Sequence, residues 1–234
     1  MNPFSRSLRS SLWILAGLAV VLGPLVFLYL KPAEGFQDPD SARIVALHVP
    51  MAWLATLFFI CSAVYATRYI VGRKMDDDDA AAAAAEIGLL CCVLATVTGS
   101  IFAHSQWGSW WNWDPRETSI FFLLLVYGAY FSLRGSVEDP VRRAIFSGVY
   151  DMLACPVMFF LIFVMPRMFQ SLHPERAHLH SSYWLALLSS FILLGGFLTH
   201  IFRIRCALGR RRLELAEVGN EPSDSVLRPT MVKH

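Results

Sequence analysis

Two histidines lie at positions where an imidazole could act as a ligand. His48 falls in an Ala-Leu-His-Val-Pro string a few residues inside an apolar run, and His173 falls in a Ser-Leu-His-Pro string between the last two apolar runs. Neutral imidazole is a common metal ligand, and a histidine inside a membrane span is costly to bury without a partner or a ligand. His48 can equally be an interfacial side chain hydrogen-bonded to a neighbouring helix, and an exposed His173 means little by itself.

A dense group of tryptophans follows the third apolar run, with four indoles in seven positions. Trp107, Trp110 and Trp111 have the helical spacing i, i+3, i+4, so a short helix at a membrane surface would gather three indoles on one side, with Trp113 beside Trp110. This flat aromatic shelf has two interpretations. It is either a belt of interfacial anchors or a platform for a large planar apolar ligand stacked on its face.

The residues after the tryptophans predict the start of a helix. Asp114, Pro115 and Glu117 form the pattern of an N-cap, an N1 proline and an N3 acid. A capped start of this kind would hold the shelf rigidly while Arg116 faces the same site.

Composition and hydropathy place these residues in a membrane protein. The chain of 234 residues is 56% hydrophobic and 16% charged, against roughly 45–50% and 25% in a soluble domain. Its apolar runs can each cross a bilayer, which needs about 20 residues; they cover residues 12–30, 44–67, 86–103, 118–133, 145–165 and 183–202. The fold class is therefore all-α, a polytopic membrane protein with a bundle of six transmembrane helices and short loops.

The domain organisation follows from these runs. We expect one transmembrane domain over residues 1–204, with the tryptophan-rich loop at 104–119, and a basic, disordered cytoplasmic tail at 205–234. The first run is too long for a signal-peptide core and is read as a retained span. Asp76 to Asp79, followed by six alanines, indicates a solvated charge run leading into a helix with Asp79 as its N-cap.

The distribution of basic residues predicts the orientation. Lysines and arginines concentrate before the first run and after the second, fourth and sixth runs, so the positive-inside rule makes both termini cytoplasmic. The first, third and fifth connections then share the outer face, and these carry the tryptophans and His173. A net charge of +2 is too small to suggest a nucleic-acid partner.

The string Trp-Gly-Ser-Trp-Trp-Asn-Trp-Asp at residues 107–114 closely resembles the WWD motif of the haem-handling proteins of cytochrome c maturation. Its place in a short six-span chain resembles the haem exporter protein C (CcmC) family. One departure is the Asp-Pro-Arg-Glu-Thr string at residues 114–118, which is more similar to the related cytochrome c synthase branch.

The resemblance implies a haem site on the outer face. The Leu-His-Val-Pro string of the second span and the histidine before the last span resemble the two external haem ligands of the family, which makes His48 and His173 the metal ligands. Two imidazoles can ligate haem iron from opposite faces while the porphyrin rests on indoles. The residues implied to bind haem are His48, His173, Trp107, Trp110, Trp111, Trp113, Asp114 and Arg116.

Other residues compete for parts of this site. Haem propionates need cations, and the outer arginines are Arg43, Arg116, Arg167 and Arg176, of which Arg116 is favoured by proximity. His178 and His180 follow His173 closely and are second candidates for its ligand role. His104 is expected beside the shelf as an interfacial or supporting side chain, and His200 lies at the cytoplasmic end of the last span.

The resemblance also implies a function without catalysis. The chain would bind haem b, as a transported ligand, at the periplasmic face of the cell inner membrane and deliver it to a periplasmic haem chaperone of the CcmE type. It would assemble with ABC-type maturation subunits of the CcmA, CcmB and CcmD types. Two alternatives remain: a cytochrome c synthase (haem lyase) subunit, favoured by the Asp-Pro-Arg-Glu-Thr string, and a haem permease, which would need polar groups at mid-membrane.

Overall fold

The computed structural model describes residues 13, 17, 30–32, 36–173 and 180–220. Within these ranges the chain is helical and contains no strand. Five stretches are long and apolar enough to cross a membrane: Ser41–Gly72, Met75–Trp107, Pro115–Ser136, Pro140–Met168 and Ser181–Leu215. The second to sixth predicted spans are thus found. The first, 12–30, lies outside the described residues except at positions 13, 17 and 30.

The helices alternate with brief connections. In chain order they are η1 (Ser41–Ile44), α2 (Val45–Gly72), α3 (Met75–Trp107), α4 (Pro115–Ser136), α5 (Pro140–Phe159), the π-helical turn η2 (Phe160–Val164), α6 (Met165–Met168) and α7 (Ser181–Asn220). Pro156 lies inside α5, just before the change to π-helical hydrogen bonding. Proline has no backbone N–H to donate, which interrupts the regular α-helical hydrogen bonds at this point.

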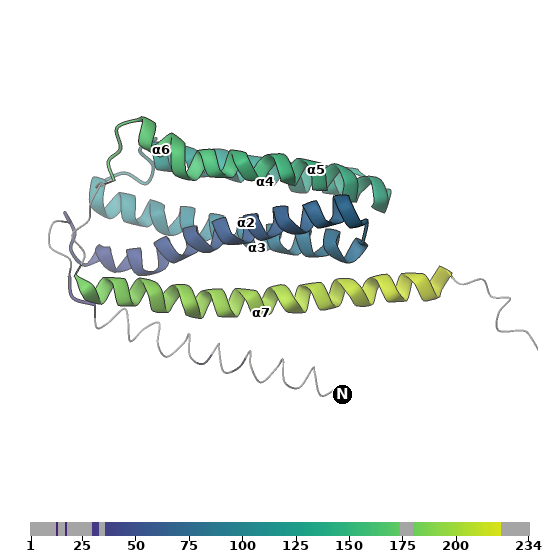
Figure 1. The fold of residues 1–234 in the computed structure, drawn as a ribbon. Helices are drawn as coiled ribbons and strands as arrows, with labels where there is room; N and C mark the ends of the chain where they lie inside the picture. Colours follow the sequence, from purple (N-terminus) through teal and green to yellow (C-terminus); the bar gives the residue numbers. More distant parts are fainter. Residues whose placement is uncertain (1–12, 14–16, 18–29, 33–35, 174–179, 221–234) are drawn as a thin grey trace, which may run out of the picture.

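The helices pack in layers around α2 and α3 (Figure 1). α4 and α5 lie on one side of this central pair, and α7 packs along the other side. The described parts of three connections, residues 36–44, 108–114 and 169–173, meet at one end of the bundle, on the left of Figure 1. We call this the loop end. It brings together residues that are far apart in the sequence.

Small side chains let α3 approach its neighbours closely. Ala80 to Ala85 are all buried, and a Cβ atom at Gly88 would lie 2.7 Å from the Phe59 ring of α2. Phe59 in turn stacks on Tyr127 of α4, with ring centroids 3.5 Å apart and planes 13° apart. The alanine-rich sequence of α3 is therefore explained by packing at the centre of the bundle.

The acidic run at the start of α3 differs from the solvated leader that the sequence suggested. α3 begins at Met75, so Asp79 lies inside the helix rather than at its cap. Asp78 is buried and pairs with Arg134 of α4 at 2.7 Å, and Asp77 is buried and pairs with Arg68 of α2 at 3.1 Å. These ion pairs connect α3 to α2 and to α4 at the end of the bundle opposite the loop end.

The last helix extends further than the sequence suggested. α7 continues to Asn220, which differs from the disordered tail expected from residue 205. Arg205 forms a two-pronged ion pair with Glu86 of α3, at 3.0 and 2.9 Å. Residues 221–234 lie outside the described part of the chain.

Candidate functional site

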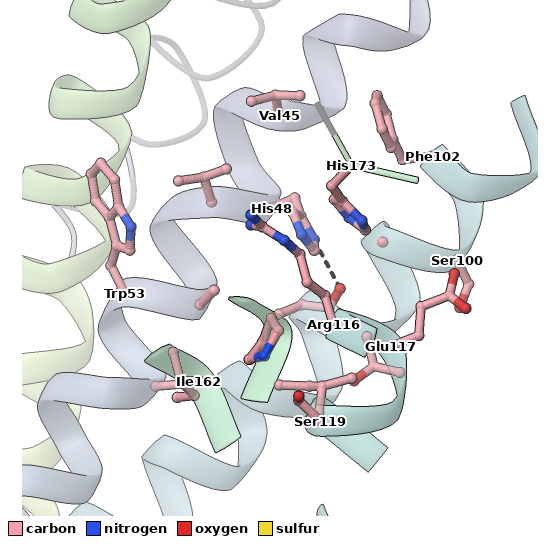
Figure 2. Close-up of a pocket in the computed structure, with 18 of the residues that line it drawn as sticks. Val45, His48, Trp53, Ser100, Phe102, Arg116, Glu117, Ser119, Ile162 and His173 are labelled. Atoms are coloured by element: carbon pink, nitrogen blue, oxygen red, sulfur yellow. Dashed lines mark hydrogen bonds between the residues drawn. The ribbon is translucent and has the colours of Figure 1, made fainter. Parts of the chain in front are cut away.

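A cavity of about 390 Å³ opens at the loop end between α2, α3, α4, η2 and the first two turns of α7. Pockets that hold organic ligands typically measure roughly 300–1,000 Å³ and are mostly apolar. The lining is mainly aliphatic and aromatic, and its ionisable side chains are His48, His173, Arg116 and Glu117. Figure 2 shows His48, His173 and Arg116 close to one another among the lining residues.

His48 is held by the backbone of α3. Its Nδ1 atom lies 2.9 Å from the Ala95 carbonyl oxygen and 3.2 Å from the Thr98 hydroxyl. A carbonyl oxygen can only accept, so Nδ1 carries the ring proton and Nε2 keeps a free lone pair. Gly99 makes room for the ring, because a Cβ atom there would lie 2.9 Å from His48 Cε1. The hydrogen bond to a neighbouring helix therefore leaves Nε2 ready to bind a metal.

His173 reaches the same tautomer by a different route. Its Nδ1 atom lies 3.1 Å from Oδ1 of Asp114. Burial is the largest influence and lowers the pKa of His173 to about 4; Arg116 and His48 add to the lowering, and Asp114 opposes it. The ring is therefore neutral near pH 7 and donates Nδ1–H to the carboxylate. Carboxylate–imidazole pairs of this kind orient metal-ligating histidines in many proteins.

Asp114 joins the start of α4 to the segment that carries His173. The predicted helix start is confirmed, since Asp114 and Glu117 form a capping box with Pro115 in the first turn. Asp114 Oδ1 also accepts from the Arg116 amide at 2.9 Å, while Oδ2 accepts from the Ser171 hydroxyl at 2.8 Å and the Leu172 amide at 2.6 Å.

The environment of Asp114 keeps it ionised. Burial alone would raise the pKa of the carboxyl, but the hydrogen bonds donated by Arg116, Ser171 and Leu172, together with His173, hold that pKa below its ordinary value. Four donors to a buried anion form charge-assisted hydrogen bonds, which hold the carboxylate and its partners in this arrangement. Asp114 itself does not line the cavity; it acts through His173.

The tryptophans do not form the expected shelf. α3 ends at Trp107, and Gly108 closes it in the left-handed region at φ 76°, so Trp110 and Trp111 do not continue its helical spacing. Trp107 and Trp111 line the cavity, and Trp107 meets His173 edge to face, with centroids 5.0 Å apart. Trp113 packs edge-on against Trp111 at 5.9 Å rather than beside Trp110.

The two remaining indoles point elsewhere. Trp110 is 58% exposed and Trp113 is 67% exposed, and neither lines the cavity. Trp110 stacks on the His104 ring, with centroids 4.2 Å apart and planes 18° apart. The tryptophan group is thus divided: Trp107 and Trp111 line the cavity, and Trp110 and Trp113 lie on the outer surface of the loop end.

A strained turn fixes the loop between α3 and α4. Trp113 has φ 54°, and a bulky residue in this region costs about 1–3 kcal/mol unless its surroundings impose it. Glu117 supplies part of that support, because its carboxylate accepts from the Asn112 amide at 2.7 Å and from the Asp114 amide at 3.3 Å. The loop is held from both sides of the turn.

Arg116 is the described outer arginine that lines the cavity. Arg43 pairs with Asp40 at 3.1 Å and donates to the Leu30 carbonyl. Arg167 donates to the Phe163 carbonyl in its own helical stretch. Arg176 lies outside the described residues. The preference for Arg116 on sequence proximity agrees with its position in the structure.

The other histidines do not line the cavity in the described part of the chain. His180 accepts at Nδ1 from the Ser182 amide at 3.3 Å, which places its proton on Nε2, the opposite tautomer to the other pair. His200 lies far along α7. His178 falls outside the described residues.

Sequence reasoning missed Trp53 and Trp184 in the cavity lining, and it missed three residues that hold parts of the site in place. Gly99 leaves room for the His48 ring, Ser171 donates to Asp114, and Gln106 bonds to the backbone of the segment just before α2. The Gln106 side chain donates to the Asp38 carbonyl at 2.9 Å and accepts from the Gln37 amide at 2.9 Å. The available signal for Gln106 was its polar amide side chain at the end of an apolar run, directly before the first tryptophan of the group. Gly99 and Ser171 offer no comparable signal without their partners.

Comparison with known proteins shows which family the chain is similar to. The family model described as Heme exporter protein C (CcmC) matches residues 1–218. Heme exporter protein C of Rhodobacter capsulatus is 27% identical over 215 residues, covering 88% of this chain and 89% of that protein. The protein of the same name from Paracoccus denitrificans is 32% identical over 138 residues, covering 58% of this chain and 57% of that protein.

Another bacterial relative gives a similar result. Heme exporter protein C of Escherichia coli K12 is 32% identical over 129 residues, covering 54% of this chain and 52% of that protein. The chain thus spans little more than half the length of the Paracoccus and Escherichia relatives in these matches. Because the family match extends over residues 1–218, the chain belongs to the heme exporter protein C (CcmC) family.

Proposed function

We propose that this protein binds haem b in the loop-end cavity and hands it on for the maturation of c-type cytochromes. The observation that carries the proposal is the matched state of His48 and His173. Both rings donate Nδ1–H to a fixed acceptor and so keep an unprotonated Nε2, and both line one apolar cavity. Neutral imidazole with Nε2 free is the form that ligates haem iron.

The rest of the cavity suits a porphyrin. Trp107 and Trp111 supply aromatic faces for a planar macrocycle. Arg116 supplies a cation beside the two histidines, where a propionate would neutralise it through charge-assisted hydrogen bonds. The relatives in this family carry haem in their name, and the chemistry of the cavity supports the same ligand for this chain.

Titration of the purified apoprotein with haem tests the ligation. We expect His48→Ala and His173→Ala each to weaken binding and to change the absorption spectrum, and His200→Ala to leave both unchanged. His180→Ala is the matched control for a histidine near the same connection. If His180→Ala alters the spectrum and His173→Ala does not, the ligand assignment is wrong.

A modified ligand tests the role of Arg116. Haem whose propionates are methyl esters lacks the anions but keeps the iron and the ring. We expect Arg116→Gln to weaken the binding of haem and to leave the binding of the ester nearly unchanged. Equal losses for both ligands would show that Arg116 serves packing rather than propionate recognition.

We also propose that the loop end faces the periplasm, with the protein in the cell inner membrane and both termini in the cytoplasm. The basic-residue distribution supports this orientation. A cysteine at Ser109 should react with an impermeant thiol reagent added outside intact cells, and one at the exposed Glu138, at the opposite end, should not. Reversed labelling would overturn the orientation.

The proposed acceptor is a periplasmic haem chaperone of the CcmE type, with ABC-type subunits of the CcmA, CcmB and CcmD types as partners. The exposed indoles of Trp110 and Trp113 are available to such a partner. We expect Trp110→Ala to keep the haem spectrum and to slow transfer to the purified chaperone, whereas Trp111→Ala should weaken haem retention itself. Unimpaired transfer by Trp110→Ala would leave that ring as a membrane anchor.

The structure gives a local reason for the string that suggested a synthase. Asp114 and Glu117 build the capping box, and Pro115 occupies the first helical turn, so helix initiation accounts for most of its residues. The permease alternative is weaker as well, since the cavity reaches no further along α2 than Ala55. Ligand handling at one end of the bundle is the function that the site supports best.

A further inference from the structure

A second polar cluster lies inside the bundle, away from the loop-end cavity. Asp151 of α5, Tyr127 of α4 and Ser62 of α2 are each 0% exposed, and none of them lines the cavity. All three belong to membrane-spanning stretches. An ionisable side chain at such a position is costly and calls for a defined partner.

The hydrogen bonds of Ser62 determine where the protons lie. The Ser62 hydroxyl is 2.8 Å from the Ala81 carbonyl oxygen of α3 and also contacts Oδ2 of Asp151. A hydroxyl has one proton to give, and a carbonyl oxygen can only accept. Ser62 therefore donates to Ala81, and a hydrogen bond between Ser62 and Asp151 requires a proton on Asp151.

The other carboxyl oxygen has a matching neighbour. The Tyr127 phenol lies beside Asp151, yet neither its hydroxyl nor Asp151 Oδ1 has a partner with hydrogen-bond geometry among the described residues. Buried polar atoms without partners are rare and costly. A hydrogen bond donated by Tyr127 to Oδ1 would satisfy both atoms, with Oδ1 as the carbonyl oxygen of a neutral acid.

No free cation in the described surroundings balances a negative charge on Asp151. The titratable and charged groups that face it are Tyr127, Tyr130 and Arg134 of α4 and Cys155 of α5. The Arg134 guanidinium is already engaged by Asp78 at 2.7 and 2.9 Å. An ionised Asp151 would thus be a buried charge without its own counter-ion, which is strongly unfavourable in a membrane.

We propose that Asp151 is a buried proton-binding site: a neutral carboxylic acid that donates from Oδ2 to Ser62 and accepts at Oδ1 from Tyr127. The resulting chain runs from Tyr127 through Asp151 and Ser62 to the Ala81 carbonyl. This chain of three hydrogen bonds links α4 to α5, α5 to α2, and α2 to α3, and each bond has one donated proton. This network is independent of haem and of the loop-end histidines.

Infrared spectroscopy of the full-length protein in lipid nanodiscs near neutral pH tests the proton directly. We expect a carbonyl band of a protonated carboxylic acid that shifts in deuterated water and is lost in Asp151→Asn. The exposed Asp76 provides the control, and Asp76→Asn should leave the band in place. No such band, or one that survives in Asp151→Asn, overturns the proposal.

Removing the acceptor gives a second test that does not depend on changing the acid. In Ser62→Ala the Asp151 proton loses its acceptor, so the band should move to higher frequency. Ser147→Ala is the matched control, because Ser147 is buried in α5 and, among the described residues, donates to the Arg143 carbonyl of its own helix. An unchanged band in Ser62→Ala contradicts the proposed donor direction.

Thermal unfolding tests the joining of the helices. Asparagine offers an amide donor to Ser62 and an oxygen to Tyr127, so Asp151→Asn should unfold at nearly the wild-type temperature. Asp151→Leu, of similar size, leaves the polar neighbours unpaired and should unfold about 4 °C or more lower. Equal loss in the two variants would show that Asp151 is needed as an anion.

Discussion

The Asp114→Asn substitution gives the sharpest test of how the site is built. Asp114 receives four donors: the amides of Arg116 and Leu172, the Ser171 hydroxyl, and Nδ1 of His173. Asparagine has one oxygen and one NH₂ group in place of the two oxygens. In either orientation of the amide, NH₂ faces one backbone N–H that it cannot bond, and one side chain, Ser171 or His173, that must change from donor to acceptor.

The size of the effect follows from these contacts. Hydrogen bonds to a charged group contribute about 1.5–3 kcal/mol each; losing the charge and one backbone hydrogen bond, with a second bond reversed, should loosen the hold on His173. Removing the partner of a metal-ligating histidine typically lowers metal affinity about 10–100-fold. We therefore expect Asp114→Asn to weaken haem binding about 10–100-fold.

The loss should not arise from protonation of His173. Asp114 raises the pKa of His173 against the effect of burial, so removing the carboxylate lowers that pKa further and leaves the ring neutral. What changes is the position of the ring and the proton on Nδ1. The affinity ratio between wild type and Asp114→Asn should accordingly stay constant between about pH 6 and pH 8.

Haem titration of the full-length apoprotein in nanodiscs, followed by absorbance, measures this ratio. Asp139→Asn is the matched control, because Asp139 caps α5 by accepting from the Arg142 amide at 2.7 Å at the opposite end of the bundle. It should bind haem as the wild type does. If the two variants bind equally well, Asp114 is only a helix cap and the orientation of His173 has another cause.

Two further predictions concern the histidines themselves. Gly99→Ala should displace the His48 ring, because the new Cβ atom would lie 2.9 Å from Cε1, and so weaken haem binding in titration; Gly128→Ala, with nothing within 4 Å, should not. The second prediction concerns pH. Because the pKa of His173 is lowered to about 4 in the folded protein, the unfolded chain takes up its proton first as the pH falls. His173 should therefore cause stability to decline from about pH 6.5 down to about pH 4, by up to about 1.4 kcal/mol per pH unit, with no contribution above that window. Unfolding measured against pH should show a shallower decline in His173→Ala, and identical curves would contradict a neutral, partly buried ring.

Local patterns in the sequence predicted much of the fold. The five described spans correspond to long apolar runs, and the start of α4 followed from Asp114, Pro115 and Glu117, residues that act within one helical turn. Signals of this kind need no knowledge of the rest of the chain. Arg116 was chosen for its place next to the capped helix start; it lines the cavity, and its binding of a propionate stays a prediction.

The errors arose where a local pattern was continued across a boundary or where a distant partner decided the outcome. Helical spacing was counted from Trp107 to Trp111 across Gly108, although glycine after a helical run is a common C-cap. Asp77 and Asp78 looked solvated because acidic runs usually are. Their burial depends on arginines from α2 and α4, which composition alone does not reveal.

The way the two imidazoles are held shows most clearly what a sequence leaves out. It nominated His48 and His173, but their tautomers depend on acceptors 47 and 59 positions away. For His48 the acceptor is the Ala95 carbonyl, part of a helix backbone that no side-chain substitution removes. For His173 it is the Asp114 carboxylate, which also holds the neighbouring Ser171 and Leu172. The site is therefore more vulnerable on the His173 side, where one carboxylate determines helix start, loop position and ring tautomer together.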